Sequence, residues 1–302
     1  MIPADEVKRL VAEVDGAACG IADVGEVEVA DFERFEKWIG RGMHGEMGYM
    51  EKYRELRRDP RLLLEGAQSI VVVAFTYYHR DQTEGNLAAI ASYAHGDDYH
   101  EVVRARLEHI ASWIRATYGG DTRVCVDTAP LMERYWAVKA GVGFVGRNRM
   151  LIVPEVGSYV FIGEILTTVR LLPDVPNMGQ CDGCGQCVSK CPVGALTAEG
   201  VNARKCLSYL TIEYRGEFGK GVDLCGRLYG CDECQRVCPH NKGLIDTPIA
   251  EFRARETLRE LTPERVIAME QGEWSEMMRK SAMKRAKLSG LQRNAKAIRN
   301  KE

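Results

Sequence analysis

CDGCGQCVSKCP, residues 181–192, is the stretch that decides the architecture of this 302-residue chain. Its cysteines follow the spacing C-x2-C-x2-C-x3-C-P, in which three thiolates bind three irons of one [4Fe–4S] cluster and the fourth thiolate binds another cluster. Gly183 and Gly185 permit the tight loop, and Pro192 prevents the chain from wrapping further around the same cluster. The spacing therefore predicts two neighbouring iron–sulfur clusters.

A second group of cysteines, over residues 231–239, repeats the tail of this pattern but lacks its first cysteine. Cys206, on a helix expected over residues 202–214, is the natural substitute, and Cys225 is the alternative. The partition that completes both clusters assigns Cys181, Cys184, Cys187 and Cys238 to one, and Cys191, Cys206, Cys231 and Cys234 to the other.

Neither zinc nor disulfide bonds account for the 11 cysteines as well as two clusters do. A zinc site rarely uses four closely spaced cysteines that end twice in Cys-Pro. Disulfides belong to oxidising compartments, whereas the sequence begins without a signal peptide and has no apolar run of the ~20 residues that a membrane span needs. We therefore expect a cytoplasmic protein, in which Cys19 and Cys125 are small buried residues.

The first 175 residues alternate between helical and strand patterns. The run of β-branched residues over 69–75 lacks polar alternation, which predicts a central strand covered on both faces. Apolar periodicity predicts helices around residues 7–14, 32–39, 103–118 and 130–140, and further strands over 123–126, 150–153 and 159–169. The fold class expected is α+β, with α/β layers.

A proline-bearing linker, residues 172–177, separates this part from the cysteine-rich part. We predict three segments, 1–175, 176–245 and 246–302. The net charge of −2 conceals an uneven distribution, because residues 279–302 carry +8 and the rest carries −10. On its own a basic terminal helix is more often a solvated face than a nucleic-acid site.

One glycine pattern does not indicate a dinucleotide site. Gly141, Gly143 and Gly146 have the G-x-G-x-x-G letters, but they follow an expected helix and precede an expected strand, which is the reverse of the required order. NAD binding through this segment is therefore not expected.

Three segments before the cysteines, VDTAPLMER (126–134), KAGVGFVGRN (139–148) and GSYVFIGE (157–164), resemble the signature of the epoxyqueuosine reductase family. The resemblance continues through CLSYLTIE (206–213) to SAMKR (281–285) and GLQRN (290–294), and so covers about residues 47–294. It implies a nitroreductase-like, reductive-dehalogenase-like cobalamin-binding domain followed by a ferredoxin-like domain with two [4Fe–4S] clusters.

The activity that this resemblance implies is reduction of epoxyqueuosine to queuosine at the wobble position of a tRNA. Electrons would come from an external flavodoxin-type or ferredoxin-type donor, and the clusters would relay them to cobalamin, which carries the difficult step. The protein would act as a monomer without membrane contact. Two other functions share some of these features: a reductive dehalogenase, which is typically exported through a twin-arginine signal, and a simple electron carrier, which would leave the first 175 residues unused.

The resemblance also implies roles for individual residues. Asp127 matches the proton donor, and acid catalysis near neutral pH would need a raised pKa, as burial away from positive charge gives. An Asp or Thr before Ala-Pro is usually a helix cap, and Thr128 keeps that role. The cobalamin contacts implied are Arg57, Tyr99, His100, Asp127, Asn148, Gly157, Ser158, Ile162 and Gly163, and the tRNA contacts implied are Lys284, Arg285, Arg293 and Asn294.

Three departures from the family pattern stand out. Longer members continue into a helical-repeat extension, which is lacking after residues 293–294. Arg147 stands where lysine is usual, and His240 replaces a tryptophan, which removes a large stacking surface next to an expected cluster.

Overall fold

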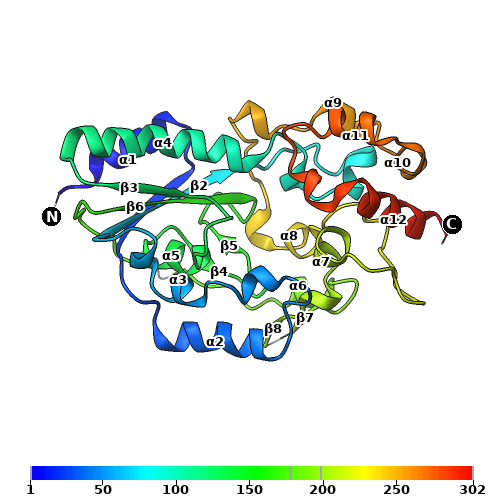
Figure 1. The fold of residues 1–302 in the computed structure, drawn as a ribbon, viewed down its shortest axis with the longest axis horizontal. Coiled ribbons are helices and arrows are strands. Elements are labelled where there is room, and N and C mark those ends of the chain that lie inside the picture. Colours follow the sequence, from blue (N-terminus) through cyan, green and yellow to red (C-terminus); the bar gives the residue numbers. More distant parts are fainter. Residues whose placement is uncertain (1, 177–178, 198, 301–302) are drawn as a thin grey trace.

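A four-stranded antiparallel sheet forms the centre of the N-terminal part (Figure 1). This computed structural model describes residues 2–176, 179–197 and 199–300. The strands, in their order across the sheet, are β1 (Ala18–Asp23), β2 (Ser69–Thr76), β6 (Val160–Thr167) and β3 (Thr122–Cys125). All eight residues of β2 are buried, so the predicted central strand is confirmed.

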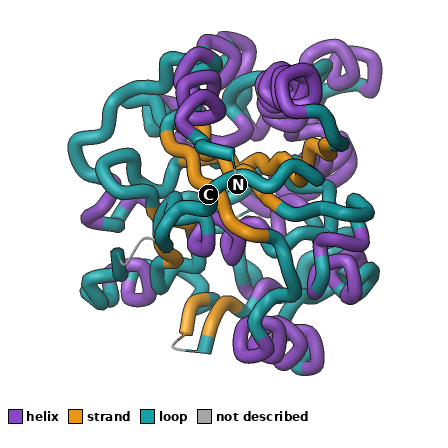
Figure 2. Tube along the Cα trace, turned by 90° about the vertical axis from the view of Figure 1, so that its left-hand side faces the viewer, coloured by secondary structure: helices purple, strands orange, loops and turns teal. Residues whose placement is uncertain are grey.

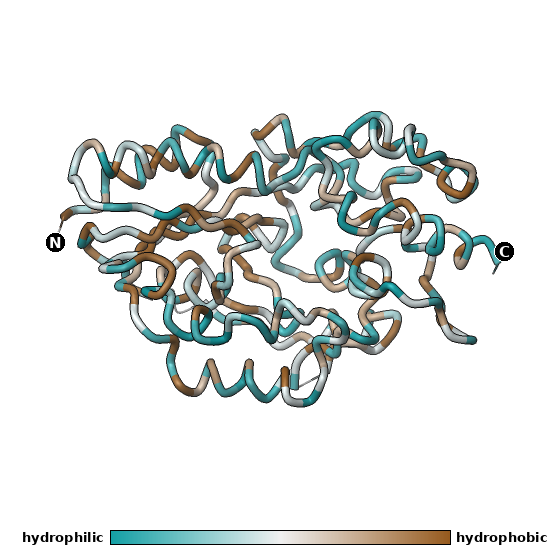
Figure 3. The backbone as a smooth tube through the Cα atoms, in the orientation of Figure 1, coloured by the Kyte–Doolittle hydropathy of each residue, from teal (hydrophilic) through white to brown (hydrophobic). Residues whose placement is uncertain are grey.

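Helices cover both faces of the sheet (Figures 1 and 2). One face packs on α1 (Asp5–Glu13) and α4 (Tyr99–Tyr118), and the other on α5 (Glu133–Lys139), with α2 (Val29–Gly40) and α3 (Arg54–Arg58) further out. Alternate residues of β2 belong to the two cores, with Val71 in the first and Val72 in the second. Hydrophobic residues are concentrated along these strands (Figure 3), and the layered α+β arrangement is confirmed.

Most of the predicted elements appear with small shifts. Gly119, with a φ of 73°, ends α4 as expected, because a glycine adopts this backbone conformation without steric cost. The helix expected from residue 130 begins at Glu133, and the strand expected over 150–153 is β5 (Leu151–Ile152), paired with β4 (Phe144–Val145).

The cysteine-rich part is built from short elements. Helices α6 (Gln186–Ser189) and α8 (Glu233–Arg236) contact each other beside the hairpin of β7 (Leu196–Thr197) and β8 (Gly200–Val201). The helix predicted over 202–214 is wrong at its start, because Cys206 has extended backbone angles between a 3-10 turn (Ala203–Lys205) and α7 (Leu207–Ile212). Cys206 therefore stands at a helix N-terminus instead of inside a helix.

The C-terminal helices share a core with a segment of the N-terminal part. They are α9 (Glu256–Arg259), α10 (Pro263–Ala268), α11 (Gln271–Met277) and α12 (Lys287–Arg299). Leu87 and Ile90 are buried in this core together with Leu228 and Tyr229. Ile249, from the same C-terminal region, is instead buried in the core between the sheet and α4. Within the described residues, no helix has the length and hydropathy to cross a membrane.

Two sequence predictions extend beyond the described residues. Asn177, at the end of the predicted linker, and Lys301, in the basic terminal segment, lie outside them. The described part of the linker is anchored at Asp174, whose carboxylate pairs with Lys8 and accepts a hydrogen bond from the Ile21 backbone N–H at 2.9 Å.

Candidate active site and cluster sites

Asp127 and His100 form an ion pair at the end of the sheet. His100 lies in the first turn of α4, and Asp127 follows β3 after one residue. The distance from His100 Nε2 to Asp127 Oδ2 is 3.2 Å, and His100 Nδ1 contacts Asp98 Oδ1 at 2.7 Å. Of the paired side chains, Asp127 is 55% exposed and His100 30% exposed. Asp127 is therefore the member of the pair that a large substrate can reach.

The backbone at Asp127 is held in an uncommon conformation. Its φ is 49°, in the left-handed region that Asp tolerates better than most residues. The Asp127 backbone N–H donates to Glu133 Oε1 at 2.7 Å. Thr128 bonds the Val126 carbonyl through its hydroxyl, and the residue before α5 is Met132, so the predicted capping role of Thr128 is wrong. The first turn of α5 instead fixes this loop through Glu133.

The ring of Tyr99 supports His100 from one side. Tyr99 stacks on His100 with ring centroids 4.1 Å apart and on Phe161 of β6 with centroids 4.3 Å apart. Asp98 caps α4 by accepting the His100 backbone N–H at 3.1 Å. Stacking and capping together fix the imidazole against Asp127.

The charges in this pair differ from the expectation. Burial by itself raises the pKa of Asp127, but the hydrogen bond and the charge of His100 outweigh it, and the pKa is lowered. For His100, burial acts to lower the pKa, while hydrogen bonds to Asp127 and Asp98 raise it from 6.5 to about 9. The raised pKa that acid catalysis by Asp127 itself would need is not found, because a cation lies next to the carboxylate. At neutral pH the proton resides on His100.

Arg57 is the predicted cobalamin contact that best fits a bound group beside this pair. The half-buried Arg57 donates through Nη1 to the Leu131 carbonyl at 3.1 Å, and its buried Nε has no hydrogen-bond partner among the described residues. A buried cationic N–H without an acceptor is suited to receive an amide or phosphate oxygen. Val160 and Ile162, on one face of β6, are partly exposed and offer an apolar surface.

Four other predicted cobalamin contacts face protein atoms. The Asn148 amide donates to the Cys234 carbonyl at 3.2 Å, and the Ser158 hydroxyl donates to Gln235 Oε1 at 2.9 Å. A Cβ at Gly157 would lie 2.4 Å from Asn241 Oδ1, and one at Gly163 would lie 2.5 Å from Leu107 Cδ1. Asn148, Gly157, Ser158 and Gly163 therefore join the sheet to the cysteine-rich part and to α4, and their contact with cobalamin stays a prediction.

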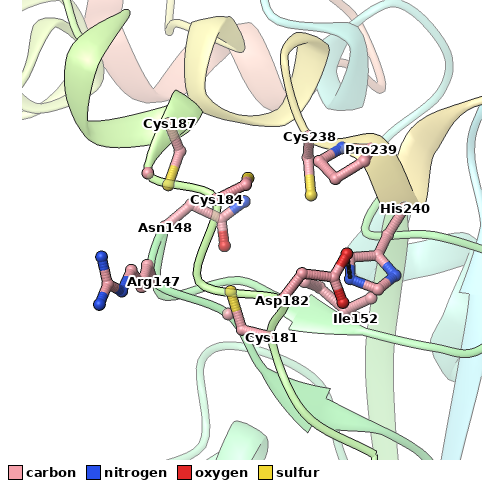
Figure 4. Close-up of a pocket in the computed structure, with 12 residues that line it drawn as sticks. Arg147, Asn148, Ile152, Cys181, Asp182, Cys184, Cys187, Cys238, Pro239 and His240 are labelled. Carbon is pink, nitrogen blue, oxygen red and sulfur yellow. Dashed lines mark ion pairs between the residues drawn. The ribbon is translucent and has the colours of Figure 1, made fainter.

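One predicted cysteine group lines a single cavity. Figure 4 shows the side chains of Cys181, Cys184, Cys187 and Cys238 around a common space, next to Asn148 and His240. The Phe144 and His240 rings pack edge to face with centroids 5.3 Å apart, and His240 Nε2 lies 3.4 Å from Asp182 Oδ2. Convergence of four thiols from two distant segments is the arrangement that a [4Fe–4S] cluster requires.

In the other predicted group, neighbouring thiols raise one another's pKa. Burial raises the pKa of Cys234, and the neighbouring Cys206 and Cys231 thiols raise it further. Burial and the neighbouring Cys191 raise the pKa of Cys206. The backbone N–H groups of Ser208 and Tyr209, at the start of α7, lower this pKa because they favour the Cys206 thiolate. Cys225, the alternative to Cys206, lies on an exposed turn and bonds Asp223.

The predicted tRNA contacts divide into two kinds. Lys284 and Arg285 are exposed, and Arg285 pairs with Glu213 at 2.8 Å and lies over the Tyr49 ring at 5.4 Å. Asn294 is wholly buried and donates to the Thr211 and Leu228 carbonyls, so its predicted contact with tRNA is wrong.

Arg293 belongs with the structural residues. Its guanidinium donates to the carbonyls of Leu210, Tyr214 and Gly216 and stacks on Phe218 at 4.3 Å. These bonds hold the loop after α7, and the contact of the partly exposed Arg293 with tRNA stays a prediction.

Three residues of this site were not predicted from the sequence. Tyr49 is 42% exposed, and the charges of Arg285, Asp127 and Arg57 all act on its hydroxyl. Glu133 lies inside the VDTAPLMER segment, where an acid in the first turn of an expected helix indicates a residue that can bind nearby backbone N–H groups. Glu164 is buried on β6, and an acidic residue within an otherwise apolar strand indicates an unusual buried acid.

Two family models match the chain. The model described as "Epoxyqueuosine reductase QueG, DUF1730" matches residues 57–128, and the model described as "4Fe-4S double cluster binding domain" matches residues 180–241. The epoxyqueuosine reductase of Leadbetterella byssophila is 36% identical over 96% of this chain and 96% of its own length. That of Gloeobacter violaceus is 38% identical over 92% of this chain and 90% of its own length.

Solved structures agree with these matches. An epoxyqueuosine reductase bound to a tRNA-Tyr epoxyqueuosine-modified stem loop has a TM-score of 0.89 and 29% identity, covering 97% of this chain and 80% of that chain. The epoxyqueuosine reductase from Streptococcus thermophilus has a TM-score of 0.83 and 27% identity over the same shares. A catabolic reductive dehalogenase, 18% identical with a TM-score of 0.50, covers 96% of this chain and 38% of that chain and is similar in fold.

Proposed function

Because the chain belongs to the epoxyqueuosine reductase family, we propose that it reduces epoxyqueuosine in tRNA to queuosine. The observation that carries the proposal is the ion pair of Asp127 and His100, which stores a proton at an accessible edge of the sheet. Loss of the epoxide oxygen requires protonation of that oxygen, and a positioned acid is the group that accelerates such a step.

In this proposal Asp127 is the residue that faces the epoxide. His100 holds the proton at neutral pH and transfers it through the 3.2 Å contact as negative charge develops on the departing oxygen. Glu133 fixes the Asp127 backbone, and Tyr99 and Asp98 fix His100. A preorganised pair of this kind needs little rearrangement during the reaction.

Cobalamin, when bound, would supply the low-valent cobalt chemistry that opens the epoxide. The residues that would hold it are Arg57, through its buried Nε, and the apolar surface that includes Ile162. Tyr99 and His100 would lie at the border between this surface and the substrate. The backbone around Asp127 would keep the carboxylate directed toward the same space.

Two [4Fe–4S] clusters in a ferredoxin-like segment would relay the electrons. The convergence of Cys181, Cys184, Cys187 and Cys238 supports one cluster, and the proximity of Cys191, Cys206, Cys231 and Cys234 supports the other. The donor would be an external protein of the flavodoxin or ferredoxin type.

Lys284 and Arg285 would contact tRNA phosphates, since both are exposed at the C-terminal edge of the molecule. Sequence-specific binding of single-stranded RNA usually relies on splayed bases that stack on aromatic rings. Tyr49, next to Arg285 and electrostatically coupled to Asp127, is placed for such stacking.

The three segments would have different roles. Residues 1–175 would bind cobalamin and carry catalysis, residues 176–245 would transfer electrons, and residues 246–302 would contact RNA. We propose that the protein acts as a monomer in the cytoplasm, where its tRNA substrate is found.

The direct test uses reconstituted, reduced protein and tRNA that contains epoxyqueuosine. Mass spectrometry of the digested nucleosides should show the loss of one oxygen atom. Asp127→Asn should reduce conversion by about 100-fold or more, because it removes the group that faces the epoxide. Absence of conversion by the wild-type protein, with cobalamin and iron both present at full occupancy, would contradict the proposal.

A further inference from the structure

Two buried histidines hold together the ends of the segment of residues 79–95. His79 follows β2 and is 4% exposed, and His95 precedes α4 and is 0% exposed. The distance from His79 Nε2 to His95 Nδ1 is 3.0 Å, and the two ring centroids are 5.1 Å apart. Residues 16 positions apart in the sequence are therefore joined by a contact between their imidazoles.

Each ring also contacts an oxygen atom with its second nitrogen. His79 Nδ1 lies 2.6 Å from Asp81 Oδ1, and His95 Nε2 lies 3.0 Å from the Ile90 carbonyl oxygen. Burial acts to raise the pKa of Asp81, but hydrogen bonds from Arg259 and His79 lower it to about 2. Asp81 is therefore a carboxylate, and both oxygens can only accept. Both outer nitrogens must carry an N–H.

The charges around the pair come from its own segment and from α9. Asp81 faces His79, and Arg259 of α9 pairs with the same carboxylate. Arg259 also lies 4.0 Å from Glu84 and 3.4 Å from Glu256. These two acids balance much of the Arg259 charge, so the Asp81 carboxylate can still stabilise a cation on His79.

The three contacts determine how many protons the two rings carry. One N–H points to Asp81, one points to the Ile90 carbonyl, and a third lies between the rings, because a hydrogen bond between two nitrogens needs one donor. Two neutral imidazoles have only two N–H groups in total. The pair therefore holds one additional proton. Its charge belongs to His79, because the Asp81 carboxylate offsets the cost of burying a cation there.

The middle of the segment binds the cysteine-rich part. The Ala91 backbone N–H donates to the Tyr229 carbonyl at 2.7 Å. Asp232 accepts the Ser92 backbone N–H at 2.7 Å and the Ser92 hydroxyl at 2.8 Å. These contacts depend on a segment whose two ends are held together by the histidine pair.

We propose that His79 and His95 form a pH-sensitive clasp, which holds residues 79–95 on the cysteine-rich part and opens when His95 gains a proton. With that proton, two N–H groups would face each other at the 3.0 Å contact, and two cations would lie side by side. The clasp goes beyond the proposed function and does not depend on its substrate. It involves none of the proposed cluster ligands or RNA contacts.

The environment of His95 sets the pH at which the clasp opens. Burial, followed by the charge of His79, lowers the pKa of His95 from 6.5 to about 4, although the Ile90 and Leu87 carbonyls and Asp81 act to raise it. The stabilisation by neutral His95 is fully present above 6.5 and is lost as the pH falls through about 4. Loss of the shared proton at higher pH would leave one contact without a donor. The clasp is therefore complete only at intermediate pH.

Nitrogen-15 NMR of the cluster-loaded protein tests the proton count. Near pH 6 both ring nitrogens of His79 should carry a proton, whereas His95 should carry one on Nε2 and none on Nδ1. The variants His79→Gln and His95→Asn assign the signals, and His109, exposed on α4, serves as the reference imidazole. A neutral His79 near pH 6 would overturn the inference.

Hydrogen exchange followed by mass spectrometry tests the opening. In the wild-type protein, protection of the peptide that contains Ala91 and Ser92 should fall by about tenfold or more between pH 6 and pH 4.5, after correction for intrinsic exchange, because the open segment binds more protons. His95→Asn should lose this pH dependence, since its side-chain oxygen can accept the His79 N–H but takes up no proton. The control His109→Asn should keep it.

His95→Leu separates the clasp from a structural role of the ring. It should lower protection at both pH values, because the buried His79 N–H loses its acceptor. A purely structural histidine would give the same pH dependence in folded His95→Asn as in the wild type, and that result would overturn the clasp. Constant protection in the wild type between pH 6 and pH 4.5 would do the same, whether or not the enzyme converts tRNA.

Discussion

Replacement of His100 by glutamine should lower stability in a pH-dependent way. The rise of the His100 pKa from 6.5 to about 9 corresponds to about 3 kcal/mol of stabilisation of the folded state by protonated His100. This uses 1.36 kcal/mol for each tenfold change in proton affinity. Asp127 is 55% exposed, and solvent screening reduces this to about 1–2 kcal/mol. The lowered pKa of Asp127 describes the same ion pair and is not added.

The direction of the His100 pKa shift determines at which pH the substitution costs more stability. A group whose pKa is raised in the folded state stabilises the protein fully below its unfolded pKa, here 6.5, and the stabilisation disappears as the pH rises through about 9. His100→Gln should therefore cost about 1–2 kcal/mol more at pH values below 6.5 than at pH values above 9.

Urea unfolding followed by circular dichroism, with all proteins in the same cluster-loaded state, measures this difference. His109→Gln is the matched control, because His109 is exposed on the same helix and has no ion pair in the described chain. An equal loss of stability at both ends of the pH range would show that the imidazole carries no extra proton, and would refute the role given to His100.

Three further predictions concern the C-terminal segment and the clusters. Asn294→Ala should lower the free energy of unfolding by about 2–4 kcal/mol, measured by urea unfolding, because two buried carbonyls lose their donor; wild-type stability would contradict its structural role. Lys284→Ala should weaken tRNA binding and reduce the slope of log K against log salt by about 1 in a filter-binding titration; an unchanged slope would show that Lys284 contacts no phosphate. Cys206→Ser should reduce the iron content by up to about half, whereas Cys225→Ser should leave it unchanged; the reverse result would make Cys225 the ligand.

The features that depend on local spacing were predicted best from the sequence. The partition of the cysteines follows from short intervals along the chain; the first predicted group lines one cavity, and in the second group Cys206 and Cys231 raise the pKa of Cys234. The β-branched run of β2 predicted a central strand because burial on both faces excludes polar residues from it.

Contacts between distant segments could not be predicted in this way. The pair of His100 and Asp127 depends on α4 and β3 meeting at one end of the sheet, and this pair reverses the expected pKa shift of Asp127. Composition also cannot distinguish an exposed polar side chain from a buried one. Asn294 and Lys284 stand in the same basic segment, yet only the buried Asn294 holds neighbouring backbone together.

The core shared by Leu87, Ile90 and the C-terminal helices has a consequence for how RNA is recognised. Linked domains with a small interface usually rotate against each other, but a common hydrophobic core opposes such rotation. Leu228 and Tyr229 of the cysteine-rich part are buried in the same core, so we expect no clamshell closure around the substrate. The adjustment must then come from the nucleic acid, whose anticodon loop has to unstack and reshape itself to fit a rigid receptor.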